Sequence, residues 1–192
     1  MRAVHSVLDA ALRLQSALTA PLSFAASRIE YSSDWRFIFG QGKLKGRRLY
    51  LARAEDTACE VVAVYNAAGS FGLMASYDCV RRAFFARGAL TLFPLGFFGG
   101  NPYSIGRVLR YFGIKSCAVR HEELDRDGSY ILSFWNGAEK LSLHTVFFRV
   151  INGTAEAYNL YPSDRAPRRF DPGERRGLII RCLRLEPPDR NE

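Results

Sequence analysis

Residues 57–68 read TACEVVAVYNAA, an apolar run that predicts a helix with a cysteine in its first turn. Thr57 and Glu60 have the spacing of a capping box, in which Thr57 is the N-cap and Glu60 the third helical residue. Cys59 would then be the second helical residue, where unpaired backbone N–H groups and the helix dipole lower the pKa of a thiol. The stretch therefore predicts a nucleophile, provided that a histidine reaches it.

The downstream histidine that fits this chemistry is His144, which begins a run rich in β-branched and aromatic residues. The run leads to Asn152-Gly153, the strongest short-range signal for a two-residue hairpin turn, because a type I′ turn needs positive φ at both central residues. A hairpin with strands over 143–150 and 155–161 is therefore expected.

The register of this hairpin predicts which side chains meet His144. Ile151 pairs with Thr154, so His144 lies opposite Tyr161 and Asn159 is its diagonal neighbour, about 6–8 Å away at Cβ. An asparagine amide at that distance can orient an imidazole, and Tyr161 can cover the contact from water. Each residue alone also has a structural explanation: a core cysteine, a histidine satisfied within a sheet, and an asparagine that ends a strand.

A cysteine at a helix start, then histidine on a strand, then asparagine on the next strand is the order found in papain-like cysteine peptidases. Over residues 50–162 the chain resembles small bacterial members, most of all the peptidase domains that trim leader peptides from bacteriocins. The segments that carry the resemblance are 58–67, 100–109, and 144–147 through 158–161. It implies a peptide or protein substrate and acyl transfer by Cys59, with His144 as proton acceptor and Asn159 as its orienting residue.

The oxyanion hole is where the chain departs from this family. In this family the two oxyanion donors are the backbone N–H of the nucleophile and the side chain of a glutamine six residues before it. Here the N–H is that of Cys59, and the glutamine position is occupied by Arg53. A guanidinium can donate hydrogen bonds to an oxyanion, or it can pair with Glu55 or Asp56 instead. Because loss of one oxyanion donor costs about 10²–10³ in rate, a catalytically inactive module that binds peptides is the alternative to a hydrolase or transferase.

Three further residues are expected to bind substrate: Tyr161 and Asn101 from the segments above, and Trp135, just before the hairpin. The glycine-rich stretch 96–101 lacks the ending of a phosphate-binding P-loop, and its aromatic residues suggest a packed or substrate-lining loop. The three histidines are scattered and no cysteines cluster, so neither a metal site nor a cofactor is expected.

Composition sets the class of protein. The chain has 192 residues, of which 48% are hydrophobic, and this predicts one folded domain. Its net charge of +8 comes without a nucleic-acid-binding signature, so a solvated basic surface is expected and nucleic acid is not, although a basic interaction protein stays an alternative. Cys79, Cys117 and Cys182 form no CxxC pair, which suggests reduced core cysteines in a cytoplasmic protein.

Residues 1–20 predict an amphipathic helix rather than a signal peptide, and no stretch reaches the roughly 20 apolar residues that span a bilayer. Residues 1–50 are an N-terminal extension with this helix and strands, 51–162 the papain-like catalytic core, and 163–192 a basic loop, final strand and tail. Helices that precede strands predict an α+β fold, and the resemblance makes it papain-like, with N-terminal helices on a mainly antiparallel sheet. The helices are expected over 59–68, 76–87 and 101–112, and the strands around 35–53 and over 114–119, 130–134, 143–150, 155–161 and 177–185.

Overall fold

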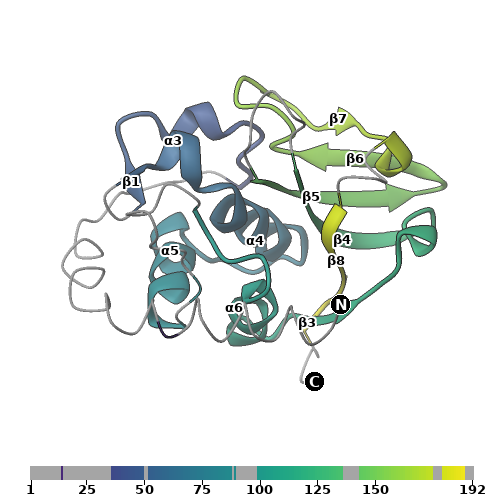
Figure 1. Cartoon of the computed structure of the whole chain (residues 1–192), viewed down its shortest axis with the longest axis horizontal. Helices are drawn as coiled ribbons and strands as arrows, with labels where there is room; N and C mark the ends of the chain where they lie inside the picture. The colour runs from purple at the N-terminus through teal and green to yellow at the C-terminus, as the bar shows by residue number, and fades with distance from the viewer. Residues whose placement is uncertain are drawn as a thin grey trace.

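The computed structural model describes residues 14, 36–49, 52–87, 89, 99–135, 143–174 and 179–188. Its helices pack on one side of a six-stranded antiparallel sheet, where α4 lies against β5 and α6 against β3 (Figure 1). This arrangement confirms the predicted α+β class. The amphipathic helix expected over 1–20 lies outside the described residues.

The helices are α3 (Ala54–Thr57), α4 (Cys59–Ser70), α5 (Tyr77–Ala86) and α6 (Ile105–Tyr111), with 3₁₀ turns η1 (Gln41–Leu44) and η2 (His121–Glu123). Strands β1 (Arg48–Leu49) and β2 (Ala52–Arg53) form a small separate sheet. The large sheet has the order β3-β8-β4-β5-β6-β7, from β3 (Lys115–Ala118), β4 (Gly128–Trp135), β5 (Leu143–Ile151), β6 (Thr154–Tyr158), β7 (Arg168–Arg169) and β8 (Ile179–Glu186). Within the described residues, no helix has the length and apolar character that crossing a membrane requires.

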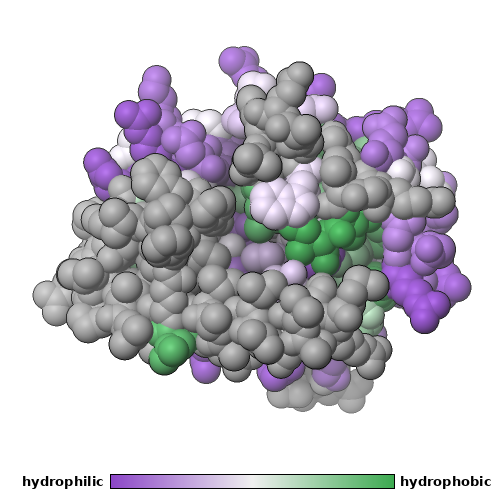
Figure 2. All heavy atoms as spheres, viewed as in Figure 1, coloured by the Kyte–Doolittle hydropathy of each residue, from purple (hydrophilic) through white to green (hydrophobic). Residues whose placement is uncertain are grey.

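The two faces of the sheet bury two separate apolar clusters, because side chains alternate along each strand. On the helical face, Phe147 and Ile131 join a core built largely from α4. On the opposite face, Phe148 and Tyr130 pack with Phe170, which follows β7. Ten of the twelve residues of α4 are buried, as expected for a helix in the centre of the molecule. On the surface, hydrophilic residues gather at the outer edge of the sheet half, and hydrophobic residues lie toward the middle of the same view (Figure 2).

The hairpin of β5 and β6 has the predicted turn and register. Ile151 pairs with Thr154, and Asn152 and Gly153 have φ values of 51° and 71°. However, β6 ends at Tyr158 rather than at residue 161.

The early end of β6 follows from the backbone of the next residue. Asn159 adopts a left-handed φ of 65°, and its N–H donates to the carbonyl of Phe39 at 2.8 Å instead of to β5. Tyr161 then belongs to a turn in which its N–H donates to Asp164 at 2.8 Å. The predicted pairing of His144 with Tyr161 is therefore wrong.

The start of α4 also differs from the prediction. Thr57 is the last residue of α3, and its hydroxyl donates to the carbonyl of Arg53 at 2.9 Å rather than capping α4. Ala58 is the N-cap, so no capping box forms and Cys59 is the first helical residue. The sequence pattern missed α3, the short helix that ends at Thr57 and is separated from α4 by Ala58.

Other boundaries moved for local reasons. Residues 41–44 form the 3₁₀ turn η1 where a strand-like segment was expected. Helix α4 continues through Gly69, which was expected to end it. The glycine instead makes room for the carbonyl of Arg36, which would lie 2.7 Å from a Cβ at this position. Asn101 closes a turn by accepting the N–H of Tyr103 at 2.9 Å, and α6 begins only after it, whereas Gly113, with φ 75°, ends that helix as predicted.

Asn66 attaches the segment before η1 to the central helix. Its side-chain amide donates to the carbonyl of Ile38 and accepts the N–H of the same residue, both at 2.8 Å. Both residues are fully buried. One side chain therefore satisfies two backbone groups that water cannot reach.

We expect Asn66→Ala to lower the free energy of unfolding by about 2–4 kcal/mol, because it leaves a buried N–H and a buried carbonyl unpaired, each at a cost of about 1–3 kcal/mol. Urea unfolding measures the loss. Cys79→Ser, on the exposed surface of α5, is the control and should change stability little. Equal stability of the two variants would contradict the role of Asn66.

Candidate functional site

Cys59 lies where the central helix meets the sheet. It is the first residue of α4 and is 5% exposed. Its thiol lies 3.3 Å from Oε2 of Glu60 and 3.9 Å from the carbonyl of Leu143, at the start of β5. The sulfur therefore touches the strand that carries His144.

The expected low pKa of this thiol is wrong for the structure. Burial raises the pKa of Cys59 well above its usual value, and the charge of Glu60 and its hydrogen bond to the thiol raise it further. The backbone N–H of Thr145 lowers it, but by less. The sequence pattern correctly placed Cys59 in the first turn of a helix, but it gave Glu60 a capping role and not a buried position beside the thiol.

Glu60 is the most tightly held side chain of the site. It is 1% exposed; Oε2 accepts the N–H of Gly100 at 2.9 Å, and Oε1 accepts the hydroxyl of Thr145 at 3.2 Å. Burial raises the pKa of Glu60 to about 7, against the opposing effect of these donors. Sequence reasoning assigned Glu60 only a capping role, although a charged residue inside an apolar run was a signal of a buried function.

Gly99 and Gly100 pack directly on the start of α4. A Cβ at Gly100 would lie 2.6 Å from Cβ of Glu60, and one at Gly99 would lie 2.1 Å from the carbonyl of Thr57. This part of the glycine-rich stretch is therefore a packed loop, and residues 96–98 lie outside the described residues.

His144 and Asn159 lie together, but not through the amide. Nε2 of His144 is 2.8 Å from the main-chain carbonyl of Asn159. The His144 ring packs edge-to-face with the ring of Phe134, with 5.7 Å between the ring centroids. Among the described residues, the hydrogen-bond partners of the Cys59 sulfur are Glu60 and the backbone of β5, and the ring of His144 is not one of them. The structure thus brings Cys59 to the strand of His144, and His144 to the backbone of Asn159.

The side chain of Asn159 points to Gln41, a residue that sequence reasoning missed. Its Nδ2 donates to Oε1 of Gln41 at 3.2 Å, and Nε2 of Gln41 donates to the carbonyl of Ala54 at 2.9 Å. Oδ1 of Asn159 is buried and has no donor among the described residues. Two amides therefore link the end of β6 to the segment just before the cysteine. The sequence offered one signal for a role of Gln41, which is that this polar residue stands between two glycines, Gly40 and Gly42.

Arg53, the predicted second oxyanion donor, is the exposed last residue of β2. Glu55, one of its two expected ion-pair partners, accepts the N–H of Gly46 at 3.1 Å. The substrate-binding candidates differ in access. Tyr161 and Trp135 are 47% and 43% exposed, whereas Asn101 is fully buried in its turn.

The remaining cysteines are free, and two of them are not in the core. Cys79 and Cys117 are exposed, which corrects the prediction, and Cys182 is buried. No group of three or more histidine, cysteine, aspartate or glutamate side chains that could hold a metal ion occurs among the described residues.

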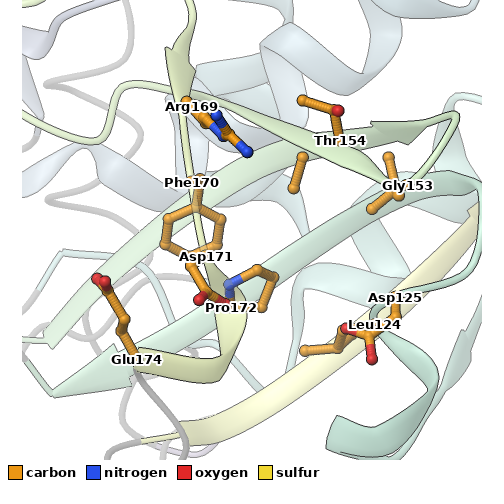
Figure 3. Close-up of a pocket in the computed structure, with 11 residues that line it drawn as sticks. Leu124, Asp125, Gly153, Thr154, Arg169, Phe170, Asp171, Pro172 and Glu174 are labelled. Atoms are coloured by element: carbon orange, nitrogen blue, oxygen red, sulfur yellow. The ribbon is translucent and has the colours of Figure 1, made fainter.

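A cavity of about 590 Å³ lies away from these residues, beside the tip of the β5–β6 hairpin. Phe170 and Pro172 line it between Arg169 on one side and Leu124 and Asp125 on the other (Figure 3). None of the candidate catalytic side chains lines this cavity.

Comparison with known proteins identifies a fold but no family. No protein-family model matches the chain, and no curated protein matches it. A solved structure, the crystal structure of a double glycine motif protease from an AMS/PCAT transporter in complex with the leader peptide, is similar with a TM-score of 0.50 and 15% identity. The match covers 75% of this chain and 89% of that one. It confirms the papain-like α+β fold that the sequence resemblance implied.

We expect iodoacetamide at pH 7 to label native Cys59 at least tenfold more slowly than Cys79 and Cys117, because burial and a raised pKa leave little accessible thiolate. Peptide mapping by mass spectrometry resolves the individual cysteines. In urea the difference should vanish. Faster labelling of Cys59 than of the exposed cysteines would contradict this description of the thiol.

Proposed function

We propose that this chain is a cysteine hydrolase, a peptidase or amidase, in which Cys59 is the nucleophile and a peptide is the substrate. The observation that carries the proposal is a cysteine at the first residue of the central helix, with its sulfur against the strand of His144, in a papain-like fold. The similar protease, solved in complex with a leader peptide, supports a peptide rather than a small amide.

The proposed reaction is acyl transfer. The sulfur of Cys59 attacks the carbonyl carbon, His144 takes up the thiol proton and delivers it to the leaving amine, and water hydrolyses the acyl-enzyme. The backbone N–H of Cys59 has no partner within the helix, as at any first helical residue, and is the first oxyanion donor. Arg53 is the proposed second donor.

The contact of His144 supports its role as a base. A carbonyl oxygen only accepts hydrogen bonds, so the nitrogen that faces Asn159 carries the proton of the neutral ring. Nδ1 is then the basic nitrogen. In this proposal the backbone carbonyl of Asn159 fixes the tautomer, and its amide, bonded to Gln41, fixes the backbone.

A peptide-binding module without activity is the second candidate. The observation that favours it is the burial of the Cys59 thiol, which raises its pKa and makes it a poorer nucleophile. Such a module would retain the fold and the peptide site and would not use the sulfur.

A screen of fluorogenic peptides decides between the two functions. We expect Cys59→Ala and His144→Ala each to lower kcat/KM by 10³-fold or more, and Cys79→Ala, on the surface of α5, to leave it unchanged. Arg53→Gln should retain or raise activity if that position supplies the second oxyanion donor. Peptide binding without cleavage, unaltered by Cys59→Ala, would support the inactive module instead.

The orienting group of His144 has its own test. If the backbone carbonyl of Asn159 is that group, Asn159→Gly should keep kcat within about tenfold of the wild type, because glycine tolerates a φ of 65° and keeps the carbonyl. Asn159→Val should lose far more, since a β-branched residue resists this conformation. Similar large losses in both variants would assign the role to the amide.

A further inference from the structure

The carboxylate beside the thiol has an unusual set of partners. Glu60 faces the thiol of Cys59 at 3.3 Å, the N–H of Gly100 at 2.9 Å and the hydroxyl of Thr145 at 3.2 Å. The described residues provide no lysine or arginine partner for it. A buried carboxylate normally has a cation or several strong donors. Here two neutral donors hold it, and its third neighbour is a group that can itself lose a proton.

Two such groups at 3.3 Å cannot both carry a negative charge when both side chains are buried. The first proton that the pair loses leaves one negative charge, and the second is held to much higher pH. Over a wide range of pH the pair therefore contains one proton.

We propose that Cys59 and Glu60 share this proton, and that Glu60 is the catalytic group that accepts it from the thiol when the sulfur attacks. The catalytic part of this inference rests on the proposed function; the shared proton does not. As the bond from sulfur to the carbonyl carbon forms, the π electron pair of the carbonyl moves onto oxygen and the thiol proton moves to Oε2. Nothing is oxidised or reduced. The proton then passes from Oε2 to the basic Nδ1 of His144, which delivers it to the leaving amine as the bond from carbon to nitrogen breaks.

The role of Glu60 as proton acceptor explains why this carboxylate lies inside the core. Transfer of the proton along the hydrogen bond moves one buried charge from oxygen to sulfur and creates no second charge, so the site does not have to solvate an ion pair. The donors on Gly100 and Thr145 hold the carboxylate in place toward the sulfur.

The neighbouring elements contribute few groups that titrate. On β5 they are His144, whose Nε2 faces Asn159, and the half-buried Arg149. On α3 they are Glu55, bonded to Gly46, and the exposed Asp56. The packed loop contributes Gly99 and Gly100, which have no titratable side chain. Among the described residues, the groups that contact the thiol are Glu60 and the backbone of β5, so we assign the pH response of the thiol to the pair.

The test is the rate of Cys59 alkylation by iodoacetamide from pH 5 to pH 10, followed by peptide mapping of the full chain. A shared proton predicts a rate that rises around pH 7, where Glu60 titrates, and then stays level over about two pH units. The level region arises because the thiolate fraction of a pair with one proton does not depend on pH. An isolated thiol with a raised pKa gives instead a rate that rises tenfold per pH unit throughout.

Glu60→Gln should abolish the level region, so that labelling rises tenfold per pH unit and exceeds the wild-type rate above pH 7, because the carboxylate charge that raises the pKa of the thiol is gone. Glu55→Gln, which removes a carboxylate that does not touch the thiol, is the matched control and should keep the wild-type profile. A continuous rise in the wild type, or a level region that persists in Glu60→Gln, would overturn the proposal, because the pH response would then not come from the pair.

Thermal unfolding shows whether Glu60→Gln is folded. If it is not, the wild-type profile and Thr145→Val decide: loss of the hydroxyl that lowers the pKa of Glu60 should move the rise to higher pH, and an unmoved rise would count against the proposal. If the labelling rate shows a level region but no peptide is cleaved, the shared proton is supported and the proposed hydrolase function is contradicted. If peptides are cleaved but the labelling rate rises continuously with pH, the hydrolase function is supported and the shared proton is contradicted.

Discussion

The carboxylate of Glu60 joins the start of its own helix to two parts of the fold that are distant in sequence. It contacts the start of α4 through Cys59, the sheet through Thr145 and the packed loop through Gly100. Thr145 is in turn 2.9 Å from Ser133 on β4, so the network continues into the middle of the sheet. The position of the sulfur depends on these contacts, because they fix where the helix begins relative to the strands.

A second set of polar contacts acts on the other side of the site. Asn66 holds the segment before η1 against α4, and this segment leads directly to Gln41, whose amide lies between Asn159 and Ala54. The central helix is otherwise apolar and nearly all buried. Its few polar side chains therefore carry the specific connections, whereas the apolar ones supply packing that many related sequences could supply equally well.

The sequence predicted those features that depend on local pattern. The hairpin turn at Asn152 and Gly153 and the helix end at Gly113 have strong short-range signals, and both formed as expected. The α+β class followed from the order of these elements.

Features that depend on contacts distant in sequence could not be predicted in this way. The capping box at Thr57 failed because Glu60 found buried partners on β5 and at Gly100. The raised pKa of the thiol has the same origin. The partner of Asn159 is Gln41, 118 positions away, and no spacing rule connects them.

The contact between His144 and Asn159 has a consequence for how such sites vary between proteins. A side chain that orients an imidazole ties its position to a few residue types, but a main-chain carbonyl is present in every residue. What the position must keep is a left-handed backbone, which asparagine, aspartate and glycine adopt most readily. Sequences that differ at this place can thus share one geometry, and a motif search that requires a particular third residue would pass over them.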